Sequence, residues 1–289
     1  MTRSESGELH PTCFPDYPLF RRACRSGLSV VRPFVPRTYP DNYGVNFRSG
    51  WPPSYWAFGR MRALLALKDA QGFKPKRVLE VASGDGSLCA CLSLDGCETV
   101  ANDLITKGLE LAKERFTLAN PFQILGGNLF DLSPKKTGRF DLVLACEVLE
   151  HVAHTDAFLR HLKGFVAPGG HLLITTPNGA YMRNKLPTHS QIDDFAALET
   201  HQFKPDADGH LFLITPVELY QLAVGAGFVI DRMNLWGTPL LNGHCKLVLL
   251  SGRAGVWPAY MGELLAQKLP CRLRQSLCCA ISAVLSIAQ

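Results

Sequence analysis

Two carboxylates and an imidazole stand close together near the middle of the chain. Glu150 and His151 follow Glu147 by three and four positions, so on a helix the three side chains would share one face. A neutral imidazole can take up a proton from a bound hydroxyl group, and a neighbouring carboxylate can hold the ring in place. The spacing therefore predicts a proton-transfer site with His151 as general base and Glu147 beside it. One carboxylate could instead only cap a helix.

A turn of small residues is the second feature that could do chemistry. It runs from Glu80 to Gly86 and includes Ala82 and Gly84. Small side chains let a ligand approach the backbone, and they expose the N–H groups at the start of the following helix. Asp103 lies 23 residues after Glu80, where a carboxylate can accept both hydroxyl groups of a ribose. The turn and the acid together predict a nucleotide-like ligand.

Both features must be positioned by regular elements, and residues 77 to 250 alternate between strand and helix patterns. Short apolar runs predict strands at 78–81, 99–102, 122–125, 140–145 and 171–175. Apolar periodicity predicts helices at 55–70, 87–94, 108–118, 158–166 and 216–226. A closing pair of strands is expected at 228–233 and 246–250. The order predicts an α/β fold: a doubly wound, mostly parallel, Rossmann-like sheet with a final antiparallel strand and helices on both faces.

Taken together, these motifs resemble the class I S-adenosylmethionine-dependent methyltransferases over residues 77 to 250. The turn is similar to the family's E/D-x-G-x-G-x-G pattern with Ala82 at its first glycine, while Cys89 stands where a dinucleotide fingerprint needs glycine. Asn128 occupies the position of a family Asp that accepts a hydrogen bond from adenine. The resemblance implies S-adenosyl-L-methionine as cofactor, bound by residues at the ends of the predicted strands: Glu80, Ala82, Gly84, Gly86, Asp103, Leu104, Asn128, Leu129 and Cys146.

The resemblance also suggests the reaction. It favours O-methylation of a small molecule or glycan, with His151 removing the proton of the acceptor. A non-catalytic protein that keeps only the fold is an alternative, because Ala82 and Asn128 depart from the family pattern. The intact Gly84, Gly86 and Asp103 argue against that alternative.

A metal-assisted reaction is a further alternative. The stretch from Glu147 to His151 resembles the ligand set of the ubiquinone-type O-methyltransferases and of the small-RNA 3′-end 2′-O-methyltransferases, which add a later His. His210 stands in a comparable place, so the resemblance admits an RNA 2′-O-methyltransferase with a divalent ion. His210 could equally line the substrate pocket or fasten its loop, and metal dependence stays open.

Three parts of the chain are expected. Residues 1–75 form an aromatic, Arg-rich lid or cap segment, and residues 76–252 form the methyltransferase domain, whose insertion 178–215 is a substrate loop. Residues 253–289 are predicted to be a C-terminal helical tail. The tail is expected to dock on the domain or on a second subunit, or to make a peripheral membrane contact.

Composition and charge narrow the function classes. With 47% hydrophobic and 19% charged residues, the 289-residue chain can bury a sizeable core. The net charge of +5 divides into +4 for residues 1–60, +3 for 251–289 and −2 for the middle, so a nucleic-acid acceptor is disfavoured. No apolar run spans a bilayer and no secretory signal is recognisable, so a cytoplasmic protein is expected.

Overall fold

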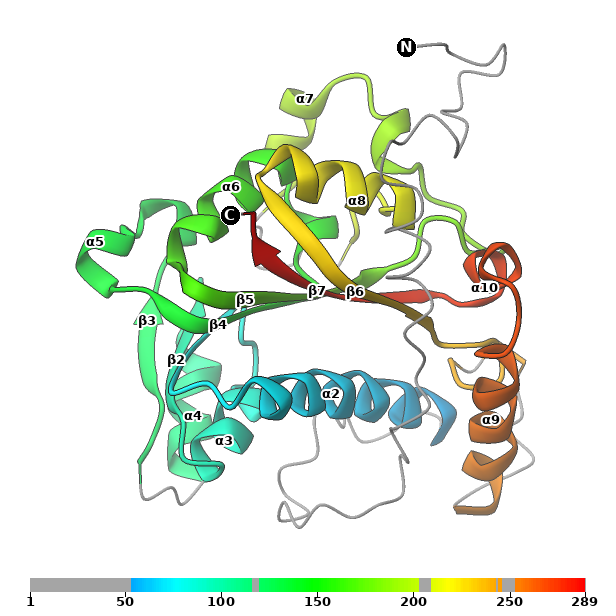
Figure 1. Cartoon of the computed structure of the whole chain (residues 1–289), viewed down its shortest axis with the longest axis horizontal. Coiled ribbons are helices and arrows are strands. Elements are labelled where there is room, and N and C mark those ends of the chain that lie inside the picture. Colours follow the sequence, from blue (N-terminus) through cyan, green and yellow to red (C-terminus); the bar gives the residue numbers. More distant parts are fainter. Residues whose placement is uncertain (1–52, 116–119, 203–208, 243, 246–252, 289) are drawn as a thin grey trace.

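A seven-stranded sheet forms the centre of the computed structural model, which describes residues 53–115, 120–202, 209–242, 244–245 and 253–288. The strand order is β3-β2-β1-β4-β5-β7-β6 (Figure 1). The strands are β1 (Arg77–Val81), β2 (Glu98–Asp103), β3 (Gln123–Gly126), β4 (Phe140–Cys146), β5 (Val166–Pro177), β6 (Phe228–Trp236) and β7 (Ala280–Ile287). Strands β1 to β5 are parallel, and β7 runs antiparallel to both β5 and β6. The predicted fold class is confirmed.

Helices cover both faces of the sheet, because the central strands are buried on both sides. Figure 1 shows α2 (Pro53–Phe73), α3 (Ser87–Leu94) and α4 (Lys107–Arg115) on one face. The other face carries α5 (Pro134–Thr137), α6 (Thr155–Phe165) and α8 (Pro216–Gly225), with α7 (Phe195–Glu199) further out. Helices α9 (Arg253–Ala266) and α10 (Cys271–Leu277) stand at one end, and the 3₁₀ turns are Leu129–Asp131, Leu149–His151 and His189–Gln191.

Local sequence explains why these helices form where they do. In α6, the apolar side chains Phe158, Leu162 and Phe165 are buried against the sheet, whereas Asp156 and Arg160 pair on its outer surface. Helix α8 begins at a capping box, in which Thr215 and Glu218 satisfy each other's backbone N–H groups. Both helices lie where their apolar periodicity predicts them.

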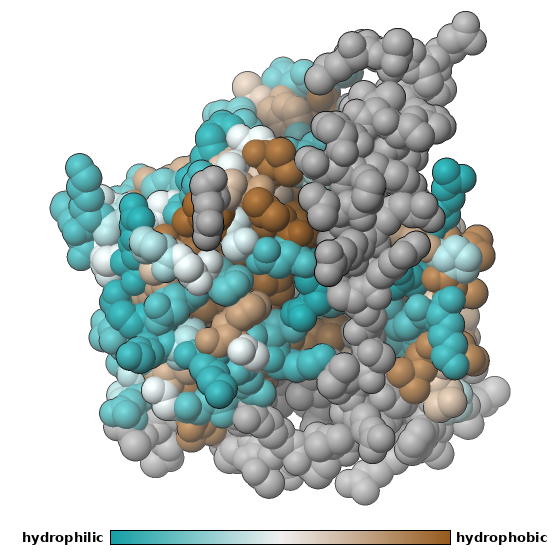
Figure 2. Space-filling view, in the orientation of Figure 1, coloured by the Kyte–Doolittle hydropathy of each residue, from teal (hydrophilic) through white to brown (hydrophobic). Residues whose placement is uncertain are grey.

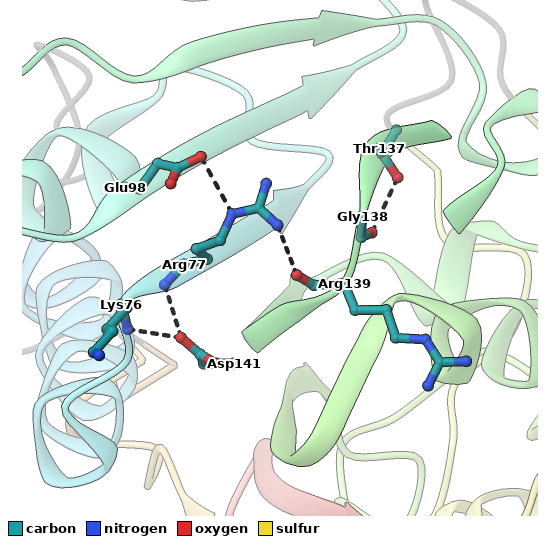
Figure 3. Close-up of polar contacts among 7 residues, drawn as sticks. All are labelled: Lys76, Arg77, Glu98, Thr137, Gly138, Arg139 and Asp141. Atoms are coloured by element: carbon teal, nitrogen blue, oxygen red, sulfur yellow. Dashed lines mark hydrogen bonds and ion pairs between the residues drawn. The ribbon is translucent and has the colours of Figure 1, made fainter. Parts of the chain in front are cut away.

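The amino ends of the central strands are tied together by polar contacts (Figure 3). Arg77 on β1 donates to the carboxylate of Glu98 at 3.2 Å and to the backbone carbonyl of Arg139 at 2.9 Å. The Asp141 carboxylate accepts the backbone N–H groups of Lys76 and Arg77 at 2.8 and 2.9 Å. These bonds fix β1, β2 and β4 in register at the edge opposite their carboxyl ends.

The C-terminal segment corrects one prediction. Residues 253–289 do not form only a helical tail, because residues 280–287 form β7, which is inserted between β5 and β6. Ile281, Val284 and Leu285 are buried there, so this apolar run cannot lie on a bilayer surface. The segment does dock on the domain, but it does so as a strand of the central sheet. None of the described helices is long and apolar enough to cross a membrane.

Some predictions fall outside the described residues. The strand expected at 246–250, residues 1–52 of the lid or cap segment expected at 1–75, and the end of the helix expected at 108–118 belong to this group. The helix predicted at 55–70 is described and corresponds to α2.

Candidate active site

A cavity of about 460 Å³ opens at the carboxyl ends of β1, β2 and β4. Ligands of doubly wound folds bind at this edge, where the strand order reverses direction. Its lining residues come from the strand ends, the 3₁₀ turns, α6 and the loop before α8: Val81, Ala82, Asn102, Asp103, Leu104, Gly127, Asn128, Leu129, Glu147, Val148, His151, Val152, Phe158, His201, Gln202, Gly209 and Leu211.

The small-residue turn after β1 forms one wall of this region. Ala82, Gly84 and Gly86 all have left-handed backbone conformations, with φ of 53°, 57° and 66°. A Cβ atom on Gly84 would meet open space, whereas one on Gly86 would come within 3.0 Å of the Phe122 ring. Gly86 is therefore required by packing, and the backbone at Gly84 faces space that a ligand can fill. Ala82 accepts the same conformation at a modest cost in strain.

Asp103 links the turn to the end of β2. One carboxylate oxygen accepts the backbone N–H of Gly84 at 2.9 Å, and the other accepts that of Ile105 at 3.0 Å. The carboxylate is half-buried and lines the cavity, so it has lone pairs left to accept further hydrogen bonds while it holds the turn.

Glu80 lies behind the turn rather than in the cavity. It is 4% exposed, and its carboxylate accepts the backbone N–H of Cys89 in the first turn of α3 at 3.2 Å. Burial raises the pKa of Glu80 to about 8. Glu80 thus caps α3 from outside the helix and supports the turn.

We expect Glu80 to make stability pH-dependent, since its pKa rises from an ordinary 4.5 to about 8 on folding. Between these values the folded chain binds one proton more than the unfolded chain, so its free energy of unfolding falls as pH rises. The slope is about 1.4 kcal/mol per pH unit. Glu80→Gln should lack this slope in denaturation curves from pH 5 to 8. Parallel curves for the two proteins would mean that the folded chain holds Glu80 ionised.

Asn128 also lines the cavity, and its side chain caps a 3₁₀ turn. Its amide oxygen accepts the backbone N–H of Phe130 at 3.0 Å and thereby caps the 3₁₀ turn Leu129–Asp131. The nearby Asn102 donates to the carbonyls of Leu125 and Gly127 at 2.7 and 3.0 Å, which holds the end of β3 against β2. A carbonyl oxygen has two lone pairs, so Asn128 can still accept from a ligand.

The predicted common helical face of Glu147, Glu150 and His151 is wrong. Strand β4 ends at Cys146, Glu147 is left-handed with φ of 57°, and only Leu149–His151 form a 3₁₀ turn. The reason is that the backbone N–H of Glu147 still bonds to the carbonyl of Thr175 on β5, at 2.8 Å. A helix therefore cannot begin until the chain has left the sheet.

Glu147 is held from two sides. Its carboxylate accepts the hydroxyl of Thr175 at 2.8 Å and pairs with Arg62 of α2 at 3.2 Å. The side chain is 23% exposed and lines the cavity. The Glu147 carboxylate is therefore held in a fixed position. Next to it lies a separate group made of one carboxylate and two imidazoles.

That second group consists of Glu150, His151 and His210. The Nε2 atoms of both histidines lie 4.0 Å from Oε1 of Glu150, and the imidazole rings meet edge to face. Glu150 is fully buried; its Oε2 accepts the hydroxyl of Thr176 at 2.9 Å, while no group of the described residues hydrogen-bonds to Oε1. Burial, followed by the charge of Glu147, raises the pKa of Glu150, and burial lowers the pKa of His210. The arrangement suits either a shared proton or a cation.

The loop 178–215 brings His210 to this place. The backbone N–H of Leu211 bonds to the carbonyl of Glu150 at 2.9 Å, and Gln202 accepts the N–H of Ala153 at 3.0 Å. His154 contacts Glu199 at 2.6 Å. These bonds fasten the loop beside the cavity, so His201, Gln202 and Leu211 line it.

The structure gathers most of the predicted site residues. Ala82, Asp103, Leu104, Asn128, Leu129, Glu147 and His151 line one cavity. Glu80, Gly84, Gly86 and Cys146 do not line it. Burial raises the pKa of the Cys146 thiol to about 12, so this thiol stays protonated.

Sequence reasoning missed other lining residues. Val81 and Gly127 adjoin predicted residues and could have been found from the strand ends. Phe158 reads as an ordinary apolar helix residue, and Gln202 and Gly209 lie in a loop without a regular pattern. Only the folded structure shows that these three residues reach the cavity.

A doubly wound sheet with this order, a glycine turn beside a strand-end acid, and a cavity between that turn and an imidazole together define a class I S-adenosylmethionine-dependent methyltransferase. The family model for a methyltransferase domain matches residues 55–232, and the chain belongs to that family. It is an S-adenosylmethionine-dependent enzyme.

Relatives and solved structures agree with this assignment. The chain is 28% identical over 176 residues to the ubiquinone biosynthesis O-methyltransferase of Mesorhizobium japonicum, covering 60% of this chain and 68% of the relative. It is 30% identical over 175 residues to the enzyme of the same name from Psychrobacter arcticus, covering 58% and 65%. The N-methyltransferase NodS of Bradyrhizobium japonicum, solved with S-adenosyl-L-homocysteine, shares the fold with a TM-score of 0.50 at 13% identity, covering 80% of this chain and 88% of that one.

Proposed function

We propose that the chain transfers the methyl group of S-adenosylmethionine to a hydroxyl group of a small molecule or glycan in the cytoplasm. One observation carries the proposal: the cavity lined by Ala82 of the small-residue turn and by Asp103 is also lined by Glu147 and His151. The cofactor supplies an electrophilic methyl group on a sulfonium. An in-line displacement needs an acceptor held close to that methyl group and a base for the acceptor's proton.

The cofactor half of the cavity is proposed to lie along β1 and β2. Asp103 would accept the ribose hydroxyls, and the backbone of Ala82 to Gly86 would lie against the ligand. Asn128, with Leu104 and Leu129 beside it, would contact the adenine. The backbone at Gly84 leaves room for a ligand beside the turn, because a Cβ atom there would meet nothing within 4 Å.

The acceptor half is proposed to lie along the turn after β4. His151 is 31% exposed in its side chain and lines the cavity, so its ring can reach a bound hydroxyl. It takes the hydroxyl proton while the acceptor oxygen bonds to the methyl carbon, and the electron pair of the broken carbon–sulfur bond remains on sulfur. Glu150 lies behind the ring and orients it, and Glu147 gives the wall a negative charge.

A divalent metal ion is a second candidate device. Ligand atoms of Glu150, His151 and His210 all lie within 4.8 Å of one another, and the buried Oε1 of Glu150 has no hydrogen-bond partner in the part of the chain that the structure describes. One carboxylate and two imidazoles suit zinc, iron or manganese. An ion there would polarise the acceptor hydroxyl and lower the pKa of its proton.

The nature of the acceptor is inferred from charge and from the relatives. The part of the chain between residues 61 and 250 is net −2, which fits a small molecule better than RNA. The two relatives described above are named as O-methyltransferases. His201 and the other lining residues of the loop 178–215 are proposed to contact the acceptor.

The test is a transfer assay with methyl-labelled cofactor against hydroxylated metabolites and glycans, with amines and small RNA as competing classes. Label should appear on a hydroxylated small acceptor. Asp103→Ala should weaken cofactor binding about 10- to 150-fold, the effect of losing hydrogen bonds to a charged group. Label on an amine or on RNA, or unchanged cofactor affinity in a folded Asp103→Ala protein, would contradict the proposal.

A further inference from the structure

The loop after β5 and the helices α9 and α10 carry many exposed apolar side chains. Six of them are between 36% and 61% exposed: Met182, Leu186, Met261, Leu265, Leu269 and Leu273. We call residues 182–186 together with 261–273 the basic-apolar surface. Figure 2 shows hydrophobic and hydrophilic residues side by side over α9 and α10, at the right-hand edge of the view. So many exposed apolar groups in two short segments mark an interaction surface.

Hydrogen bonds join the two segments. The backbone N–H of Met182 donates to the carbonyl of Ser276 at 2.9 Å. The buried side chain of Asn178 donates to the carbonyls of Gln275 and Cys278 at 2.8 and 2.7 Å. The loop after β5 therefore lies against the end of α10, the helix that carries Arg272 and Leu273.

The charges on this surface have one sign. Its four exposed basic side chains are Arg183, Lys185, Lys268 and Arg272. Residues 178–192 contain no acid, and Glu263 is the sole acid in residues 253–289. Glu263 is fully buried, where it accepts the backbone N–H groups of Gly237 and Thr238. Residues 182–186 and 261–273 therefore expose basic and apolar side chains but no acidic side chain.

We propose that the basic-apolar surface docks on an anionic bilayer. Apolar side chains gain by entering the boundary between headgroups and acyl chains, while Lys and Arg remain among the anionic headgroups. Each Lys or Arg close to such a surface strengthens binding about fivefold. A nucleic acid would use the cations but not the apolar groups, and an apolar protein partner would not need four cations.

The position of this surface fits its role. Met182 follows β5, which ends at Pro177, and α10 precedes β7, which begins at Ala280. Because β7 is antiparallel to β5, both segments lie at the carboxyl ends of the parallel strands, the edge at which the cavity opens. The contact is peripheral, since no described helix could span a bilayer. It does not depend on which acceptor the enzyme methylates.

The test is sedimentation of the full chain with vesicles. Vesicles of phosphatidylcholine with about a quarter phosphatidylglycerol should bind at least about tenfold more tightly than phosphatidylcholine alone, and high salt should remove most of that difference. Leu265→Glu and Leu273→Glu should each weaken binding about tenfold or more, because each removes an inserted side chain and adds a repelled charge. Lys268→Glu should weaken it by a similar factor.

Matched controls come from α4, on another part of the surface. Leu111 is 57% exposed, and Lys113 is exposed beside it. Leu111→Glu and Lys113→Glu make the same chemical changes and should leave vesicle binding within about twofold. Retained cofactor binding shows that each variant is folded.

Three outcomes would overturn the proposal. One is that the anionic vesicles fail to bind. Another is that the α4 controls lose binding as strongly as the α9 and α10 variants. The third is that binding responds to Lys268→Glu but not to the uncharged replacements Leu265→Ala and Leu273→Ala, which would identify a purely electrostatic surface for another polyanion.

Discussion

A chain that ends at residue 279 should not fold, because it lacks β7. This strand bonds to β5 over seven residue pairs and to β6 over eight, so its loss exposes two sheet edges in the interior. It also removes the buried side chains of Ile281, Val284 and Leu285, each worth about 1.5–3 kcal/mol. The sum approaches the whole stability of a domain, about 5–15 kcal/mol. Circular dichroism and limited proteolysis should show an unfolded chain without cofactor binding.

Graded variants keep this prediction testable if the truncated chain cannot be obtained. Leu285→Ala should lower the free energy of unfolding by about 2–5 kcal/mol, as for other buried leucines. Val229 on the neighbouring β6 is 45% exposed, so Val229→Ala should change it by no more than about 0.5 kcal/mol. A chain that ends after residue 287 should fold normally. Cofactor binding by the chain that ends at 279 would show that β7 is dispensable.

The proposed cofactor side of the cavity could be predicted because its signals are local. The turn from Glu80 to Gly86 and the acid at Asp103 lie on consecutive strand–helix units, and parallel packing brings their ends together. The left-handed φ at Ala82, Gly84 and Gly86 follows from the small residues themselves. Five parallel strands could be located from short apolar runs for the same reason.

The last strand was not predictable in this way. Residues 280–287 read as an apolar stretch that could be a helix, a strand or a surface segment, and periodicity alone does not decide between them. Their partners on β5 lie about a hundred residues earlier in the chain. A second apolar run, at 246–250, was also a candidate for the antiparallel strand of the sheet. Only the long-range pairing resolves the choice.

The acid–imidazole group was predicted in part. Glu147 and His151 do line the same cavity, but a helix was assumed where a left-handed Glu147 and a 3₁₀ turn occur. Glu147 therefore pairs with Arg62 of α2, and His210 takes its place beside Glu150. Both contacts depend on elements far away in the sequence, so local spacing could not show them.

His151→Ala should lower turnover by about 10²–10⁴, the usual loss when a general base is removed. Cofactor affinity should stay within about threefold, because Ala82 and Asp103 follow β1 and β2, whereas His151 follows β4. Steady-state kinetics and calorimetry measure the two effects separately. His171→Ala is the matched control. The His171 ring stacks on Phe73 and lies on the half of β5 away from the cavity, so its loss should leave turnover within about twofold.

A second set of variants separates the base from the metal ion. If an ion is held, chelation should abolish turnover and added metal should restore it, and Glu150→Gln and His210→Ala should be as damaging as His151→Ala. If His151 acts alone as the base, chelation should have no effect. Glu150→Gln should then cost no more than about tenfold, since the amide oxygen can still accept from Thr176. A folded His151→Ala enzyme with near-normal turnover would contradict both versions, because it would leave positioning of the acceptor as the remaining catalytic device.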